Sequence, residues 1–150
     1  MESDMEQGLQ IATFRLEGEW FGLDVQRIQE VTRPQAVTAV PLADAAIRGL
    51  MNVRGLIVTC LSLKHLLGFS RRDYDSSYHH IIVRDDHDDS MACLLVDEIG
   101  DVITVDPKRA ADVPSTVDPH LRRFIDTVFR LDGQLISVLD LDHLLRMEDG

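Results

Sequence analysis

Two segments of this chain recur later in the same order, and this internal repeat restricts the possible folds more than any other feature. Residues 23–31 match residues 94–102 with Leu, Val, Ile and Val in common, and residues 55–67 match residues 133–145 with six identities. Each copy has about 70 residues, a length at which a hydrophobic core is marginal by itself. The repeat therefore predicts two similar β-rich lobes that bury apolar surface against each other, with a seam in which a partner groove can form.

Short apolar runs separated by turn residues predict a chain made mostly of β-strands. Glu17-Gly18 and Asp132-Gly133 suit the two-residue turns of β-hairpins. Short helices are expected over 24–30, 63–67, 119–124 and 140–146, the third opened by Asp118-Pro119 as N-cap and first helical residue. The expected strands span 10–16, 20–23, 49–53, 56–63, 79–84, 91–96, 102–105, 128–131 and 134–139. So many short strands favour small barrels over a parallel sheet.

The charge balance excludes several classes of partner. Fifteen Lys and Arg residues stand against 26 Asp and Glu residues, for a net charge of −11, which opposes unspecific binding to nucleic acid or an anionic membrane. No apolar run approaches the ~20 residues that span a bilayer, and the acidic, polar residues 1–9 do not resemble a secretory signal. Cys60 and Cys93 lie in apolar runs and are expected to be buried free thiols.

Nothing in the sequence forms a recognisable catalytic or metal-binding motif. The acidic loop 85–90 lacks the Gly and Glu that a calcium loop requires at its sixth and twelfth positions, so it is interpreted as a solvated hairpin tip. The neighbours His79 and His80 point to opposite faces of a strand and cannot chelate one ion together. We therefore expect no enzyme activity and no cofactor, with a metal-dependent hydrolase using the acidic loop as a distant alternative.

With catalysis not indicated, binding of another protein is the remaining class of function, and four aliphatic residues are the first candidates for the binding surface. Val25 and Ile28 are spaced i, i+3, which places them on one face of a helical turn, and Val96 and Ile99 repeat the spacing in the second copy. Related by the repeat, the two pairs would face each other across the seam and line a partly open apolar groove for an amphipathic helix. The next residues in the pattern, Val31 and Val102, are expected in the core.

The order of several motifs resembles the CheW family of chemotaxis coupling proteins, from Gln10 to Met147. The first is Trp20-Phe21-Gly22-Leu23-Asp24-Val25, followed by Ile28-Gln29-Glu30-Val31 and Val40-Pro41. Residues 47–58 then resemble the family signature G-[VI]-x-N-[LV]-R-G, residues 95–102 its V-D-x-V-x-x-V segment, and residues 135–141 its closing L-D-[LI] strand. Four motifs in the family's order over the whole length make this resemblance specific.

The resemblance implies an all-β fold of two intertwined five-stranded, SH3-like β-barrels with a few short helices. A single domain over 10–147 is expected, with pseudo-repeated lobes near 10–75 and 76–147 that exchange strands, and with tails at 1–9 and 148–150. The implied function is that of a non-catalytic, cytoplasmic adaptor that joins a CheA-type histidine kinase to the cytoplasmic tip of a chemoreceptor, a methyl-accepting chemotaxis protein. No direct insertion into the membrane is expected.

The resemblance also assigns roles to individual residues. Receptor-binding roles fall on Val25, Ile28, Glu30, Asn52, Arg54, Val96 and Ile99. Gly49, Asn52 and Gly55 would shape the loop that presents Arg54, and Asn52 and Arg54, two positions apart, would share a strand face. Arg54 has a plainer interpretation as a surface ion pair, for instance with Glu30. The kinase would contact the barrel ends, where Val40 and Pro41 are placed.

Two departures from the family pattern keep alternatives open. Thr59 replaces the usual proline after the paired aliphatic residues, and Ser62 replaces the usual aspartate before a leucine. They allow a divergent copy that serves a non-flagellar chemosensory kinase pathway. A small β-barrel that binds nucleic acid is a remote alternative, which the net charge and the lack of an exposed aromatic series oppose.

Overall fold

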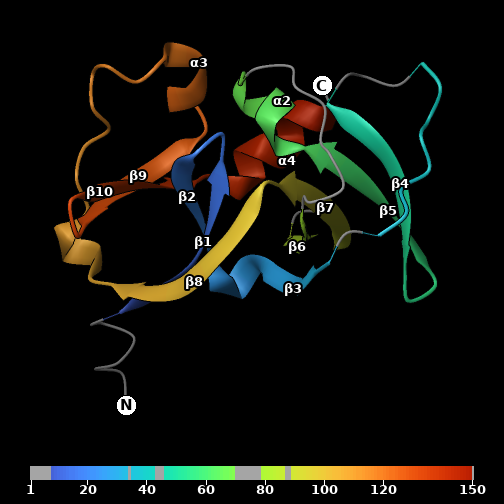
Figure 1. The fold of residues 1–150 in the computed structure, drawn as a ribbon, viewed down its shortest axis with the longest axis horizontal. Helices are drawn as coiled ribbons and strands as arrows, with labels where there is room; N and C mark the ends of the chain where they lie inside the picture. Colours follow the sequence, from blue (N-terminus) through green and yellow to red (C-terminus); the bar gives the residue numbers. More distant parts are fainter. Residues whose placement is uncertain (1–7, 34, 43–45, 70–78, 87–88, 150) are drawn as a thin grey trace.

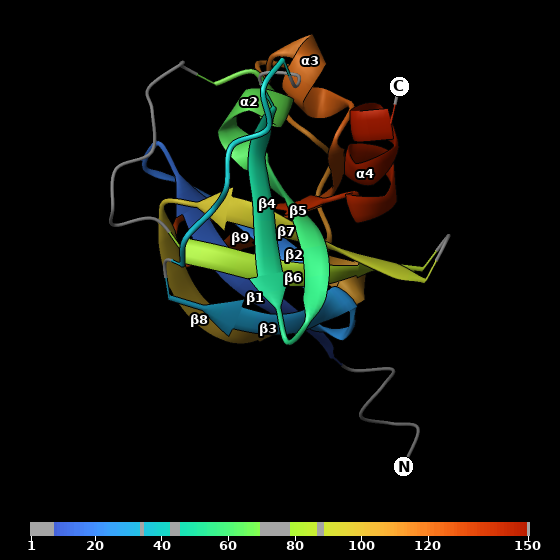
Figure 2. The same cartoon turned by 90° about the vertical axis from the view of Figure 1, so that its right-hand side faces the viewer.

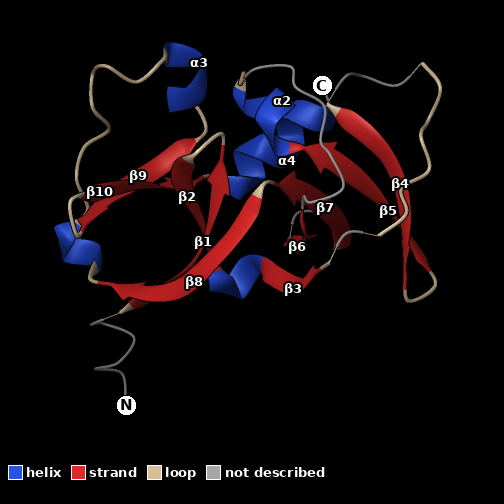
Figure 3. Ribbon diagram, viewed as in Figure 1, coloured by secondary structure: helices blue, strands red, loops and turns tan. Residues whose placement is uncertain are grey.

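The computed structural model describes residues 8–33, 35–42, 46–69, 79–86 and 89–149. In these residues ten strands form two five-stranded sheets with a few short helices, which confirms the expected fold class (Figures 1 and 3). The first sheet has the order β8 (Glu98–Val105), β1 (Leu9–Leu16), β2 (Glu19–Asp24), β10 (Gln134–Leu139), β9 (Ile125–Leu131). The second has the order β3 (Ile28–Thr32), β6 (His79–Asp85), β7 (Ser90–Val96), β5 (Leu56–Ser62), β4 (Ile47–Val53).

Within the described ranges, five short helical elements connect or follow these strands. They are η1 (Val25–Arg27), α2 (Leu63–Leu67), η2 (Pro107–Arg109), α3 (Pro119–Arg122) and α4 (Leu141–Asp149). The expected N-cap of α3 is present: the Asp118 carboxylate accepts a hydrogen bond from the His120 backbone N–H at 2.7 Å, ahead of Pro119. Ser62, the departure noted above, still caps α2, because its hydroxyl accepts from the His65 N–H. In the described residues no helix is long and apolar enough to cross a membrane.

The internal repeat is visible in the strand pairing. β1 to β5 with α2 belong to the first copy and β6 to β10 with α4 to the second, yet each sheet combines two strands of one copy with three of the other. The strand register is the same in both sheets. Ser137 lies opposite Phe21 in the first sheet, and their repeat equivalents, Thr59 and Ala92, lie opposite each other in the second. The two copies are therefore intertwined, and neither forms a sheet alone. The expected boundary near residue 75 and most of the tail 1–9 lie outside the described residues.

Three apolar clusters of described residues hold this arrangement together. Met51, Cys60 and Cys93 belong to a small cluster within the second sheet, and Ile11 and Phe129 to another within the first. The largest cluster, here called the shared core, joins strands of both sheets with α2 and α4, and Phe124 is fully buried in it. This confirms the expectation that the two halves bury apolar surface against each other, as small cores require.

Both cysteines are buried free thiols, as expected. Cys60 and Cys93 occupy opposed positions of the parallel β5–β7 pair. The hydrogen bond with Cys60, together with burial, raises the pKa of the Cys93 thiol far above its ordinary value, so this thiol stays protonated in the folded protein.

The prediction of a helix over 24–30 is wrong. A single 3-10 turn, η1, spans Val25–Arg27 after the capping residue Asp24, and the chain then continues as the edge strand β3. The apolar spacing matched a helix, but pairing with β6 supplies backbone hydrogen bonds that outweigh this local pattern. Val31 on β3 and its equivalent Val102 on β8 are 45% and 57% exposed, so their expected place in the core is wrong. Both lie on edge strands, each of which has a neighbouring strand on one side only.

Candidate interaction surface

An exposed ion pair joins two segments that lie 24 residues apart in sequence. Arg54 Nη1 lies 3.3 Å from Glu30 Oε2, and Arg54 Nη2 donates to Glu30 Oε1 at 3.4 Å. Glu30 lies on β3 and Arg54 at the tip of the β4–β5 hairpin, so the pair connects the two edge strands of the second sheet (Figure 2). The Arg54 side chain is 75% exposed and that of Glu30 is 25% exposed, which leaves the guanidinium open to a partner. The structure thus brings together two of the predicted receptor residues.

Arg54 is held in place by a tight turn rather than by a strand. Arg54 and Gly55 have φ angles of 51° and 88°, the combination found in two-residue hairpin turns. The Asn52 side-chain oxygen accepts a hydrogen bond from the Gly55 N–H at 2.9 Å, which fixes this turn. The expectation that Asn52 and Arg54 share a strand face is therefore wrong, because β4 ends at Val53. Gly55 and Asn52 do shape the loop that presents Arg54.

Gly49 has a different role from the one expected. It lies within β4 at a φ of 147°, and a side chain there would collide with the Thr38 carbonyl. The close approach allows Thr38 and Leu50 to exchange two backbone hydrogen bonds of 2.8 Å. Gly49 therefore holds the segment that leads to Val40 and Pro41 against β4, and does not shape the Arg54 loop.

Replacing Gly49 with alanine is expected to lower the free energy of unfolding by roughly 1–3 kcal/mol, because both the backbone angle and the Thr38 contact become strained. Urea unfolding monitored by circular dichroism measures this loss. Gly133→Ala is the matched control, since Gly133 also has a positive φ but a methyl group added there would meet no atom within 4 Å. Equal losses in both variants would show that the contact with Thr38 has no role.

The four predicted groove residues are not equivalent in the structure. Val25 and Ile28 are half-buried and Ile99 is exposed, on η1, β3 and β8 respectively. Val96 ends β7 and is fully buried in the shared core, so the expectation that it lines an open groove is wrong. The helical spacing used for that expectation does not apply, because β7 and β8 flank this position.

Exposed apolar side chains of the β4–β5 hairpin were missed; by the register Leu50 and Ile57 share one face of it and Leu56 lies on the other. Leu56 and Ile57 are 57% and 66% exposed, and Leu50 on β4 is also exposed. A signal was available in the repeat: the residue that corresponds to Leu56 in the second copy is Gln134, so the same hairpin position is apolar in one copy and polar in the other. Adjacent apolar residues beside a hairpin glycine also cannot both face the core.

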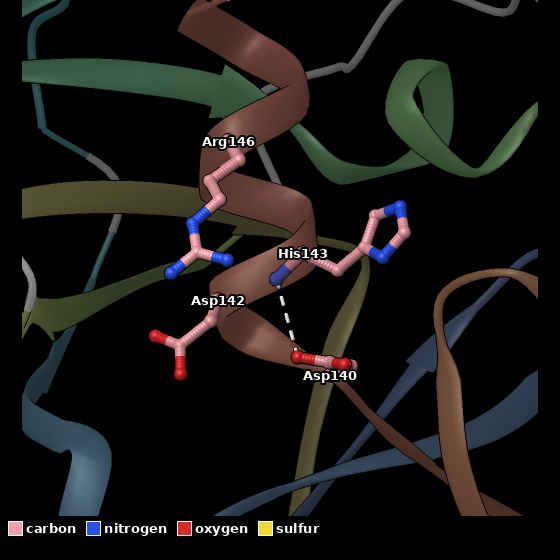
Figure 4. Close-up of a pocket in the computed structure, with 4 residues that line it drawn as sticks. All are labelled: Asp140, Asp142, His143 and Arg146. Atoms are coloured by element: carbon pink, nitrogen blue, oxygen red, sulfur yellow. Dashed lines mark hydrogen bonds between the residues drawn. The ribbon is translucent and has the colours of Figure 1, made fainter.

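Two cavities lie at the start of α4, and none of the residues lining them is a predicted groove residue. One of about 420 Å³ is lined by Asp140, Asp142, His143 and Arg146 (Figure 4). The other, of about 250 Å³, shares Asp140 and Asp142 with the first and is also lined by Asp24, Arg27, Asp126 and several apolar residues. Two of these carboxylates accept hydrogen bonds within the fold, Asp140 from the His143 backbone N–H and Asp142 from the Arg27 guanidinium. Among the described residues no group of three His, Cys, Asp or Glu side chains could hold a metal ion; residues 87–88 of the acidic loop lie outside them.

Comparison with known proteins places the chain in one family. A family model described as "CheW-like domain" matches residues 10–149. Chemotaxis protein CheW of Rhizobium meliloti is 23% identical over 142 residues, covering 95% of this chain and 90% of the relative. Chemotaxis protein CheW of Bacillus subtilis is 23% identical over 150 residues, covering 100% of this chain and 95% of the relative.

A solved structure has the same architecture. The crystal structure of the scaffolding protein TtCheW from Thermoanaerobacter tengcongensis superposes with a TM-score of 0.81 at 28% sequence identity. The match covers 91% of this chain and 92% of that protein. The intertwined sheets described above are therefore shared with a protein that is 28% identical over nearly the whole length.

Proposed function

We propose, from the premise that this chain belongs to the CheW-like domain family, that it is a non-catalytic adaptor between a chemoreceptor and a CheA-type histidine kinase. Its place of work is then the cytoplasmic tip of the receptor, and its partners are that tip and the regulatory domain of the kinase. Binding both at once lets a change in the receptor alter the geometry of the kinase, which is linkage between two binding sites rather than catalysis.

The observation that carries this proposal is the Glu30–Arg54 pair, an open charged site fixed by two edge strands. The turn geometry and the Asn52 hydrogen bond hold the Arg54 backbone, and the Glu30 carboxylate pairs with its guanidinium. Such a preorganised charge suits a partner with acidic or amide groups at its surface. We assign the receptor tip to this surface, with the half-buried or exposed residues Val25, Ile28 and Ile99 as its apolar contacts. Val96 is not part of the assignment.

We assign the kinase to the exposed aliphatic side chains of the β4–β5 hairpin, next to the Arg54 tip that is assigned to the receptor. Leu56 and Ile57 are the most exposed aliphatic side chains on that hairpin, and Leu50 is joined by backbone hydrogen bonds to Thr38, two residues before Val40. Val40 and Pro41 are exposed beside it, so the kinase surface expected at these two residues extends to the hairpin. Burying one such aliphatic side chain contributes about 1.5–3 kcal/mol before association costs. That suits a reversible contact of moderate strength.

Leu56→Asp is therefore expected to weaken binding to the kinase regulatory domain at least about tenfold, because the buried contact is replaced by a charge that must be desolvated. Titration calorimetry with the purified kinase domain measures the change. The free energy of unfolding should stay within about 0.5 kcal/mol, since the side chain is exposed.

Gln134→Asp is the matched control at the corresponding position of the second copy and should leave the affinity unchanged. If both variants weaken kinase binding equally, the assignment to the β4–β5 hairpin is wrong. If neither does while wild-type protein binds, the kinase uses another face.

A further inference from the structure

We propose that two clusters of ion pairs with opposite charge arrangements direct the folding of this chain. They favour pairing of the first repeat copy with the second copy over pairing of like copies from two chains. Each cluster lies where the chain crosses from one sheet to the other. Each brings together a residue of a helix, a residue of a crossover and a residue of a hairpin tip. The proposal concerns assembly of the fold and is independent of the proposed partners.

The first cluster consists of Lys64, Asp97 and Glu17. Lys64 Nζ on α2 lies 3.1 Å from Asp97 Oδ1 and 3.0 Å from Glu17 Oε2, and its side chain is only 7% exposed. Asp97 lies in the crossover from β7 to β8, and Glu17 at the tip of the β1–β2 hairpin. Glu17 N–H also donates to Asp97 Oδ2 at 2.8 Å, which ties the hairpin to the crossover.

The second cluster consists of Arg27, Asp142 and Asp86. Arg27 Nη2 donates to Asp142 Oδ1 on α4 at 2.8 Å, and Arg27 Nε lies 3.3 Å from Asp86 Oδ2. Arg27 lies in η1, the crossover from β2 to β3, and Asp86 follows β6 in the β6–β7 hairpin. Here too the crossover is tied to the hairpin, because Arg27 donates to the Arg84 carbonyl and Arg84 donates to the Gln26 carbonyl.

The helix residues of the two clusters occupy corresponding places in the repeat, and the crossover residues lie one position apart, because Asp97 corresponds to Gln26 and Arg27 to Glu98. Lys64 and Asp142 are the second residues of α2 and α4, within the matching segments 55–67 and 133–145. Glu17 and Asp86 each follow the strand that begins its copy. The hairpin residue is acidic in both clusters, whereas the charges of helix and crossover are exchanged: helix cation with crossover anion in the first, helix anion with crossover cation in the second.

This exchange matters because helix and crossover always come from different copies. Lys64 of the first copy contacts Asp97 of the second, and Asp142 of the second contacts Arg27 of the first. Two chains that paired copy one with copy one and copy two with copy two would bring Lys64 against Arg27 and Asp142 against Asp97. Such like-charge contacts are unfavourable, more so at Lys64, whose side chain is 7% exposed, than at Asp142, whose side chain is 47% exposed. The polarity therefore favours the observed pairing and opposes a dimer built from like copies.

The double variant Lys64→Asp/Asp97→Arg gives the first cluster the polarity of the second. It keeps an opposite-charge contact in the native pairing but removes the like-charge contacts from the alternative one. The full chain is unfolded in urea, refolded at rising protein concentration, and separated by size exclusion with light scattering. We expect native circular dichroism at low concentration and a dimer-to-monomer ratio at least about tenfold above wild type at high concentration.

Two further variants make the outcome decisive. Arg27→Asp/Asp142→Lys, which gives the second cluster the polarity of the first, should raise the dimer ratio in the same way. The fourfold variant, in which both clusters are inverted, restores opposite polarity and should return the ratio to the wild-type value. Wild-type ratios in both double variants would overturn the proposal. So would failure of the fourfold variant to fold, because the two clusters would then not be interchangeable.

Discussion

Arg54→Glu is expected to reduce receptor-dependent kinase activation at least about tenfold while leaving the fold intact. The substitution places two carboxylates at the site where the Glu30–Arg54 pair now lies, and it reverses the charge offered to the receptor. The Arg54 side chain is largely exposed, so the lost ion pair costs little stability, about 0.5 kcal/mol or less. Phosphorylation by the kinase in a mixture of receptor fragment, kinase and this chain measures the effect.

Two controls show whether the effect of Arg54→Glu depends on the place of the charge in the fold and on the sign of the charge at position 54. Asp132→Lys reverses the charge at the corresponding tip of the β9–β10 hairpin, where Asp132 and Gly133 adopt the same turn, and should leave coupling unchanged. Glu30→Arg/Arg54→Glu keeps the ion pair but inverts it, and should remain defective if the receptor reads the charge at position 54. Recovery of coupling in that inverted pair would mean that the ion pair acts only by holding β3 against the hairpin.

Phe124→Ala is expected to lower the free energy of unfolding by about 3–5 kcal/mol, the largest stability effect predicted for this chain. Phe124 is fully buried in the shared core, and its ring makes edge contacts with His120 of α3 and His143 of α4 at centroid distances of 5.5 and 5.2 Å. Its removal leaves a cavity where strands and helices of both copies meet. Equilibrium urea unfolding gives the loss directly.

Leu42→Ala is the control for this substitution, because Leu42 is fully exposed and should change stability by less than about 0.5 kcal/mol. The unfolding of Phe124→Ala should remain a single transition, because the shared core joins both sheets. Two separate transitions in the wild-type protein would show instead that the sheets are independent units. A loss below about 1 kcal/mol would show that Phe124 does not belong to an essential part of the core.

The internal repeat predicted the architecture well because equivalent strands of the two copies pair in equivalent ways in the two sheets. Matching residues such as Thr59 and Ser137 occupy the same register in their sheets. Asp132-Gly133 was identified correctly because a two-residue turn is encoded locally, by the residues that tolerate a positive φ. The helix over 63–67 was also predicted with its observed bounds, since its apolar face lies within the segment and its caps, Ser62 and Gly68, are directly next to it.

The errors concern features that depend on distant strands. Whether Ile28 lies on a helix or a strand is decided by β6, more than 50 residues away, and the apolar spacing alone favoured the helix. Val96 looked like its repeat partner Val25, but β7 is enclosed between β6 and β5, whereas Val25 lies on a short turn that is only half-buried. Gly49 could be recognised as a required glycine, but its neighbour Thr38 could not. Burial at such positions is a property of the assembled sheets.

The adaptor mechanism requires that this chain bind the kinase and the receptor at the same time. Analytical ultracentrifugation tests this requirement most directly. This chain, the regulatory domain of a CheA-type kinase and a receptor cytoplasmic fragment are sedimented alone, in pairs and together. We expect both pairs to form and a single faster-sedimenting complex to contain all three proteins. If the receptor fragment displaces the kinase domain from this chain, the two partners share one surface and the proposed adaptor mechanism is contradicted.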